Sequence, residues 1–356
     1  MKNSTKIEIP LYRPPESPLL LHLVGPIGFA LQTIFLVFAL LLFLLGKSPA
    51  WQGLVNNISI NFVAIIIEAL PFMLLGTLAG GIIEVFVPMA WVDRFFGRGK
   101  IRAVLLAGGM GLFFPTCECA IVPVVRRLLG KGVPFAAAVT FLLAGPIVNI
   151  IVAWSTATAY TYTWSVVSLR LLFGYIVAVF IGLLLGSLFT SQNGLISSLQ
   201  RDCRHSSCAP EAETGAKWYL QIRHAIGHAA HDFFEVGRYL VIGALIAALL
   251  RASVPMSIFA GLMEKPVAAI ALLMLMAVLL NLCSEADAFI AASFRWVLPA
   301  SAQMGFMVLG PMFDLKLLLM YFSIFKNRVI AALALFVPLT VFLLMLALHF
   351  FGPEFM

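Results

Sequence analysis

Charged residues are scarce in this sequence. Only 11% of its 356 residues are Asp, Glu, Lys or Arg, whereas 62% are apolar. Soluble globular domains carry about 25% charged and about 45–50% apolar residues. So few charges cannot give soluble cores of this length a polar surface, and the apolar excess must therefore face lipid. The composition excludes an ordinary cytosolic protein and predicts an all-α integral membrane protein.

Several motifs are also missing. The chain has no GxxxxGK[ST] phosphate-binding loop and no GxSxG nucleophile motif, so neither an ATPase nor a hydrolase is predicted. Its five cysteines are too few and too scattered for a secreted disulfide framework. The 23 Lys and Arg residues lie in short segments between apolar runs, which is typical of cytoplasmic loops and not of a nucleic-acid surface. We expect no enzymatic activity, no cofactor and no nucleic-acid partner.

Long apolar runs predict the membrane topology. Seven of them predict spanning helices: 19–45, 58–87, 133–158, 164–189, 225–250, 300–324 and 329–350. The segments 101–129 and 267–297 are each interrupted near the middle by polar residues. Arms of about 14 residues reach roughly 20 Å, about to the bilayer midplane. Re-entry would keep Arg126, Arg127 and Lys131 on the cytoplasmic side. We therefore expect about seven spanning helices plus two re-entrant helical hairpins.

An internal repeat supports this topology. Glu68 aligns with Glu235 and Cys117 with Cys283, and Gly145-Pro146 aligns with Gly310-Pro311. Under the re-entrant topology the two halves run in opposite directions, which makes an inverted repeat, an architecture of transporters. The predicted organisation is an N-terminal tail with a first helix (1–57), a first repeat (58–189), a cytoplasmic loop (190–224) and a second repeat (225–350).

The interrupted segments hold the strongest candidate site. One tip reads Cys117-Glu118-Cys119 and the other reads Cys283-Ser284-Glu285-Ala286-Asp287. Ionisable groups at membrane depth are functional candidates, and thiolates bind soft cations and metalloids. An isolated cysteine more often packs as a small hydrophobic residue. Two repeat-related cysteines beside carboxylates instead favour a substrate site, formed by Cys117, Cys119, Cys283, Glu118, Glu285 and Asp287. Cys117 and Cys119 can share a ligand only where the backbone is unwound.

Each of the other polar residues in the predicted spans allows a functional and a structural interpretation. Asn149 and Asp314 follow the mid-span Gly-Pro pairs, where a kinked helix could line a substrate pathway or simply serve packing. Glu68 and Glu235 are proton-coupling candidates; alternatively each caps a hairpin arm or pairs with a buried donor such as Arg170 or Arg238. The carboxylates Glu118, Glu285 and Asp287 could likewise couple transport to protons. These alternatives stay open.

Two histidine- or cysteine-containing groups are weaker candidates for metal sites. His224, His228 and His231 share one helix face, with Asp232 and Glu235 nearby, and could hold a divalent metal or form a polar interfacial face. In the loop, Cys203, His205 and Cys208 could trap a metal or metalloid. Their spacing is not a standard zinc pattern, so a reactive exposed thiol pair is the alternative.

The sequence resembles the predicted-permease family that includes the organoarsenical efflux permease ArsP and YraQ-type permeases. The resemblance rests on Phe114-Pro115-Thr116-Cys117-Glu118-Cys119-Ala120 with Pro123, on Leu143-Ala144-Gly145-Pro146 with Asn149, and on the segment 239–248 followed by Pro255. It implies a plasma-membrane permease (the bacterial inner membrane) that exports thiophilic species, among them trivalent organoarsenicals. It also implies that Cys117, Cys119 and Cys283 are the substrate ligands.

The sequence therefore predicts a secondary permease that exports a small inorganic or organometalloid substrate, most simply trivalent arsenic. A transmembrane thiol–disulfide electron carrier using Cys117 and Cys283 is the alternative. A cation channel is disfavoured, because thiolate sites hold ions too tightly for fast conduction. A homodimer and a cytoplasmic thiol or metal donor are further possible partners, besides the lipid bilayer.

Overall fold

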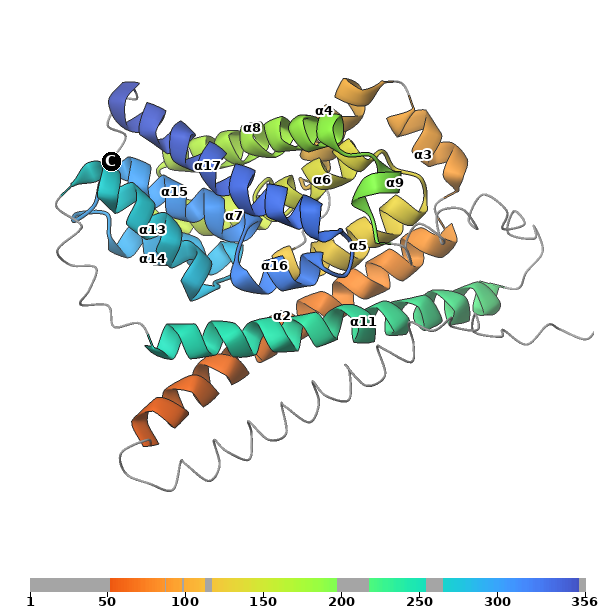
Figure 1. Ribbon diagram of the computed structural model, residues 1–356, viewed down its shortest axis with the longest axis horizontal. Coiled ribbons are helices and arrows are strands. Elements are labelled where there is room, and N and C mark those ends of the chain that lie inside the picture. The colour runs from red at the N-terminus through yellow and green to blue at the C-terminus, as the bar shows by residue number, and fades with distance from the viewer. Residues whose placement is uncertain are drawn as a thin grey trace, which may run out of the picture. The chain divides into compact units, whose positions relative to one another are not determined.

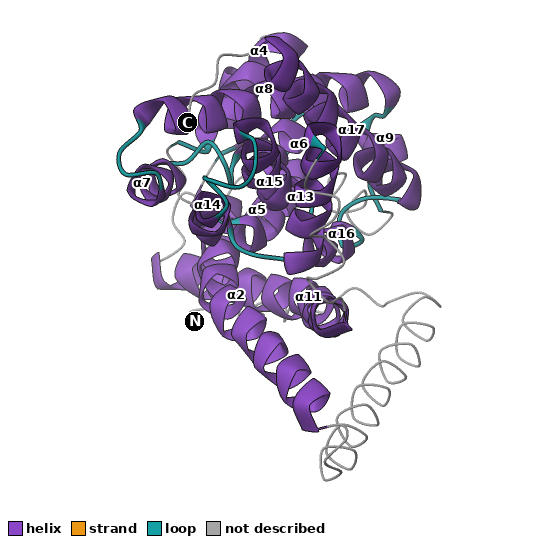
Figure 2. Cartoon of the chain, turned by 90° about the vertical axis from the view of Figure 1, so that its left-hand side faces the viewer, coloured by secondary structure: helices purple, strands orange, loops and turns teal. Residues whose placement is uncertain are grey.

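A computed structural model describes residues 52–86, 88–97, 99–112, 117–196, 218–253 and 265–351. Contacts divide the chain between Asn57 and Ile58, and the account below concerns the unit Ile58–Met356. Within the described ranges the regular structure is helical, apart from one isolated bridge between Leu195 and Phe325 (Figure 2). The all-α prediction is confirmed. The predicted helix 19–45 lies outside the described residues.

Among the described residues, five helical segments are long and apolar enough to cross a membrane. Four are single helices: α2 (Gln52–Phe86), α8 (Trp164–Leu188), α11 (Trp218–Ser253) and α17 (Asn327–Phe351) (Figure 1). The fifth is the segment Ala300–Tyr321. Twenty-five residues of helix, the length of α8, rise about 37 Å, which exceeds the ≈ 30 Å hydrocarbon core. Large apolar side chains on their outer faces, such as Ile67 and Leu75, are exposed. Lipid is the solvent that such faces require.

The first interrupted segment forms α4 (Lys100–Met110) and α5 (Glu118–Gly130). Lys100 donates to the carbonyl of Gly186 near the C-terminal end of α8, whereas Gly108 lies against Tyr175 at the middle of α8. A short turn joins α5 to α6 (Phe135–Ala144), whose Ala136 again lies against Gly186. Helix α4 therefore begins beside the C-terminal end of α8 and reaches the middle of α8 at Gly108, and α6 begins beside the same end of α8 as α4 does.

The next segment follows α8 in the antiparallel direction. Gly182 lies against Thr140, and Gly174 lies against Ile147. Further along, Arg170 Nη1 donates a hydrogen bond to Thr156 Oγ1 at 2.7 Å. The segment is not the continuous kinked helix predicted for 133–158. Helix α6 ends at Ala144, before Gly145-Pro146, and α7 runs from Ile150 to Ala159. Proline has no N–H to continue the ladder, and Asn149 starts the new helix by accepting a hydrogen bond from the Ile151 amide at 2.9 Å.

The second half has the same order of elements. Helices α13 (Pro266–Leu280) and α14 (Ser284–Ser293) flank its interruption, and α15 (Ala300–Met312) is followed by α16 (Leu315–Tyr321). The segment predicted as one helix over 300–324 is therefore also two. Here Pro311 lies inside α15, and Asp314 caps α16 by accepting from the Leu317 amide at 2.6 Å. The short helices α3 (Met89–Phe96) and α9 (Ser191–Gly194) complete the described elements.

Small residues bring the backbones into contact. A Cβ on Gly76 of α2 would collide with the Ala120 carbonyl of α5, and one on Gly243 of α11 would lie 2.9 Å from the Lys316 Cα of α16. Such close approaches between helices are typical of membrane proteins. Helix α16 also packs on α5, and α7 packs on α14. Each broken helix of one half therefore contacts the interrupted segment of the other, which brings the interruptions together.

Candidate functional site

Cys117 and Cys283 occupy the same local position. Each is the residue immediately before a helix, Cys117 before α5 and Cys283 before α14, with extended backbone (φ −77°, ψ 171° and φ −76°, ψ 157°). The backbone at Cys117 is therefore outside the helix. This is the unwound geometry that lets the side chains of Cys117 and Cys119 approach one ligand.

All three of these cysteines line one cavity. Its wall consists of Ile65, Glu68, Ala69 and Phe72 from α2, Cys117, Glu118 and Cys119 from the α5 start, Cys283, and Lys316. The three thiols are free. The space available to the centre of a water-sized sphere is about 10 Å³, which is close to the minimum that holds one water. Entry of a larger substrate therefore requires the walls to move apart.

A buried ion pair forms the polar side of this cavity. Lys316 Nζ lies 2.8 Å from Glu118 Oε1 and 3.5 Å from Asp314 Oδ2, and all three side chains are at most 3% exposed. The sequence analysis missed Lys316, because it lies in a segment read as an apolar span. A lysine two residues after an aspartate inside an apolar span is energetically costly in a membrane, and this pattern could have identified Lys316 as a candidate.

The two proton-coupling candidates lie in different surroundings. Glu68 lines the thiol cavity and lies within hydrogen-bonding reach of Cys283. Glu235 instead forms an ion pair with Arg126 (2.6 Å) and a longer one with Arg238 (3.9 Å). Pairing with Arg238 was one of the alternatives for the glutamates. Arg170 binds neither of them in the described structure; its hydrogen bonds go to Thr156 and Ser284.

The remaining predicted substrate ligands lie outside the cavity wall. Asn149 and Asp314 act as helix caps, and Asp314 reaches the cavity only through Lys316. With its nitrogen turned toward Asp314, the Asn281 amide donates to Asp314 Oδ2 at 2.7 Å. Glu285 is half-buried, and its carbonyl accepts from Ser155 at 2.7 Å. Asp287 is buried against Gly310.

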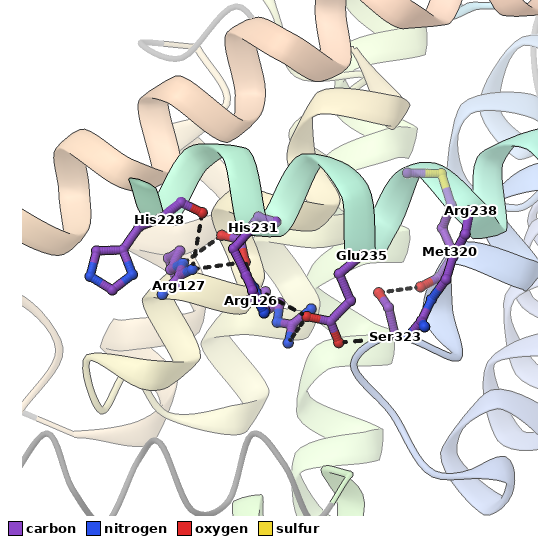
Figure 3. Close-up of polar contacts among 9 residues, drawn as sticks. Arg126, Arg127, His228, His231, Glu235, Arg238, Met320 and Ser323 are labelled. Carbon is purple, nitrogen blue, oxygen red and sulfur yellow. Dashed lines mark hydrogen bonds and ion pairs between the residues drawn. The ribbon is translucent and has the colours of Figure 1, made fainter. Parts of the chain in front are cut away.

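A second polar cluster joins α11 to α5 (Figure 3). Arg127 binds Asp232 through two bonds, Nε to Oδ2 at 2.5 Å and Nη2 to Oδ1 at 2.8 Å, beside the Arg126–Glu235 pair. Arg127 also donates to the His228 carbonyl at 3.4 Å. We call the pairs Arg126–Glu235 and Arg127–Asp232 the α5–α11 clasp. Two ion pairs between these helices fix the end of α5 against α11.

The predicted histidine metal site overlaps this clasp. Ligand atoms of His231, Asp232 and Glu235 lie within 4.8 Å of one another, so they could surround an ion. Both carboxylates, however, already bind guanidinium groups. The side chain of His224 lies outside the described residues, as do Cys203, His205 and Cys208. The loop metal trap therefore stays a prediction.

Comparison with known proteins agrees with the membrane fold. Residues 54–350 match the ArsP_1 family, described as predicted permease. A Streptococcus mutans protein named a two-component membrane permease complex subunit is 39% identical over 76% of this chain and 87% of its own length. The UPF0718 protein YcgR of Bacillus subtilis is 37% identical over 79% of this chain and 92% of its own length.

A more distant relative is the UPF0718 protein YraQ of Escherichia coli, 26% identical over 38% of this chain and 37% of its own length. No solved structure gives a significant match. The family match covers both interrupted segments and the helices around them. The chain therefore belongs to the predicted-permease family ArsP_1, and it is a multi-pass protein of the bacterial plasma membrane.

Proposed function

We propose that this permease exports a thiophilic substrate held by Cys117, Cys119 and Cys283. The observation that carries the proposal is that free thiols from two interrupted segments, far apart in sequence, line one small cavity. Thiols select soft metals and metalloids. Trivalent arsenic, as arsenite or a methylated form, is the substrate class that we favour.

Binding of such a substrate is a ligand exchange. Each As–OH group reacts with one thiol, an As–S bond replaces the As–O bond, and the hydroxide leaves with the thiol proton as water. Three thiols would hold arsenite, and two would hold a monomethylated species. In this low-dielectric site Lys316 already pairs with Glu118, and a neutral substrate adds no further charge that would need a partner.

We further propose that the chain is an inverted repeat with two re-entrant hairpins. Support comes from the shared helix order, from the paired positions of Cys117 and Cys283 and of Asn149 and Asp314, and from the end of α4 beside the middle of α8. The segments 133–158 and 300–324 would cross the membrane as broken helices. Movement of one repeat against the other would open the cavity to each side in turn.

Everted membrane vesicles test the proposed function. We expect the wild-type protein to accumulate methylarsenite or arsenite, and Cys117→Ser and Cys283→Ser to abolish accumulation without reducing the amount of protein. Ser293→Ala, a replacement on α14 outside the cavity wall, is the control and should transport normally. Accumulation that is unchanged in both cysteine variants would exclude the thiols as ligands.

A thiol–disulfide electron carrier is a second candidate, because Cys117 and Cys283 line the same cavity. Exchange between them requires the two sulfurs to come within bonding distance. The carboxylate of Glu68 in the cavity wall weighs against it, since negative charge disfavours the attacking thiolate. Trapping a Cys117–Cys283 disulfide by acid quenching during turnover would favour this function over export.

A partner subunit is also proposed. The Streptococcus mutans relative is named as one subunit of a two-component complex. We infer that this chain assembles with a second polypeptide, although a homodimer would equally bury an exposed apolar face. Mass measurement of the complex purified from its own membrane distinguishes one chain, two copies and a heteromeric assembly. The same sample tests for a bound cytoplasmic thiol or metal donor.

A further inference from the structure

Asp287 is a buried carboxylate outside the thiol cavity. It lies in the first turn of α14, its side chain is 1% exposed, and Oδ2 has no hydrogen-bond partner among the described residues. A Cβ on Gly310 would lie 2.6 Å from that oxygen, so the carboxylate is pressed against the Gly310-Pro311 segment. A charged carboxylate with no donor is costly in such surroundings.

The other half of the chain shows what packing alone requires at this position. The offset that relates Cys117 to Cys283 relates Ile121 to Asp287. Ile121 Cδ1 packs against Gly145, just as Asp287 packs against Gly310. A branched apolar side chain therefore fills the contact with a Gly-Pro pair. Packing against Gly310 therefore does not require a carboxylate at position 287.

A fixed positive charge lies nearby on α8. Arg170 is fully buried and donates from Nη1 to Thr156 of α7 and from Nη2 to the Ser284 carbonyl at the start of α14, both at 2.7 Å. Its Nε has no partner among the described residues, and in that part of the chain Arg170 forms no ion pair with Asp287.

The other ionisable groups around Asp287 are few. Tyr160 at the end of α7 donates its hydroxyl to Gln303 at 2.9 Å, and α15 carries no ionisable side chain. Glu285 lies on α14 itself. Arg170 is the charged group with the largest influence on Asp287, followed by Glu118, Lys316 and Asp314 of the buried ion-pair group. Arg170 is therefore the cation that would be attracted when Asp287 becomes negatively charged.

We propose that Asp287 is a proton-binding site, separate from the thiol cavity, and that its buried, unpartnered position suits the protonated form. Release of the proton to water leaves a carboxylate, which attracts the unpaired Nε–H of Arg170. Because Cys283 immediately precedes the rigid helix α14, displacement of Asp287 toward Arg170 also moves that thiol. Proton binding is thereby linked to the cavity. This link rests on the proposed function, whereas the proton site itself does not.

Infrared difference spectroscopy of the full-length protein in lipid nanodiscs tests the proton site without any substrate. Between acid and alkaline pH, the wild-type protein should show the carbonyl stretch of a buried protonated carboxyl group. Asp287→Asn should lack this band, and Asp287→Glu should retain it at a shifted frequency. Glu285→Gln, which changes a half-buried neighbour on the same helix, should leave it unchanged. A wild-type spectrum that persists in Asp287→Asn overturns the proposal.

Proteoliposomes then test the link to transport, with methylarsenite as the probe. Asp287→Asn should lose accumulation driven by a pH gradient and lose the accompanying proton flux, while retaining cysteine-dependent exchange at equal pH. Glu285→Gln should retain all three. Gradient-driven accumulation by Asp287→Asn would overturn the link. Absence of exchange by the wild-type protein would instead contradict the proposed function, and the infrared result would still decide the proton site.

Discussion

At the residue scale, each charge in two buried groups has a specific partner. Lys316, Glu118 and Asp314 form one buried group, and Arg127 with Asp232 forms another. Removing one partner of such a pair leaves an uncompensated charge, which costs more than the pair itself contributes. Substituting one partner of a buried pair should therefore lower the stability of the protein strongly, whereas substituting an exposed charged residue should change the stability little.

Replacement of Lys316 by Met should destabilise the protein strongly. It leaves Glu118 buried without its cation, which costs about 3–5 kcal/mol for a broken buried pair. The measurement is the thermal unfolding midpoint in detergent. The matched control is Lys326→Met, since the hydrogen bond of that lysine to the Gln192 carbonyl is exposed. The double variant Glu118→Gln/Lys316→Met should recover part of the loss; no difference between Lys316→Met and Lys326→Met would contradict the role of the pair.

Replacement of Arg127 by Ala should weaken the α5–α11 clasp. Asp232 is buried and receives two hydrogen bonds from Arg127, so we expect a loss of about 3–5 kcal/mol. Arg238→Ala is the comparison, because Arg238 is exposed and lies 3.9 Å from Glu235, a geometry worth about 0–1 kcal/mol. Denaturant unfolding of both variants measures the difference, and equal losses would contradict it.

At the element scale, the architecture depends on helices that stop in the middle of the membrane. Asn149 and Asp314 satisfy the first amide groups of α7 and α16 at those breaks. The glycines let the neighbouring backbones approach. Both devices act on whole helices, since each sets where a helix begins or how closely it packs.

Loss of the α7 cap should be measurable. Asn149→Ala removes the acceptor for the Ile151 amide and should cost about 0.5–2 kcal/mol, whereas Asn149→Ser should retain most of the stability. Hydrogen exchange of the first turn of α7, compared between the two variants, measures the effect at the cap itself. Equal protection in Asn149→Ala and the wild-type protein would show that the cap contributes nothing.

Close packing between α2 and α5 gives another prediction. Gly76→Ala would place a methyl group on the Ala120 carbonyl, so the two helices must separate, and overpacking of this kind costs about 1–3 kcal/mol. Gly227→Ala meets no atom within 4 Å and should be neutral or stabilising, because alanine favours helix. Thermal unfolding of the pair in the same detergent compares them. A Gly76→Ala protein as stable as Gly227→Ala would show that α2 can shift freely.

At the scale of the whole molecule, the proposed topology places two turns on opposite faces of the membrane. The turn at Lys131 joins α5 to α6, and the turn at Tyr162 joins α7 to α8. Re-entry of α4–α5 followed by one broken crossing puts Lys131 in the cytoplasm and Tyr162 outside.

Single cysteines at these two turns test that arrangement. In a background with all five native cysteines replaced by Ser, Lys131→Cys should react with an impermeant maleimide only in everted vesicles, and Tyr162→Cys only in intact cells. Both turns reacting from one side would contradict the broken crossing. Because the proposed function expects Ser replacement of the native thiols to abolish transport, labelling and not activity is the readout.

The sequence alone determined the class of the protein and much of its layout. Scarce charge and long apolar runs require lipid contact whatever the packing, so the all-α membrane fold was predictable. Polar residues inside 101–129 and 267–297 predicted interruptions, and the helices are interrupted there: α5 begins just after Cys117 and α14 just after Cys283. The family was also evident from the local motifs around these cysteines.

Only the tertiary structure decided which polar groups meet. Hydropathy cannot tell a kink from a break, because both follow from one proline and the outcome depends on caps such as Asn149. It also cannot tell that Lys316 neutralises Glu118, or that Asp287 lies apart from the thiols while Glu68 lies beside Cys283. Lys316 and Glu118 are 198 positions apart, and the packing of one half against the other sets such contacts.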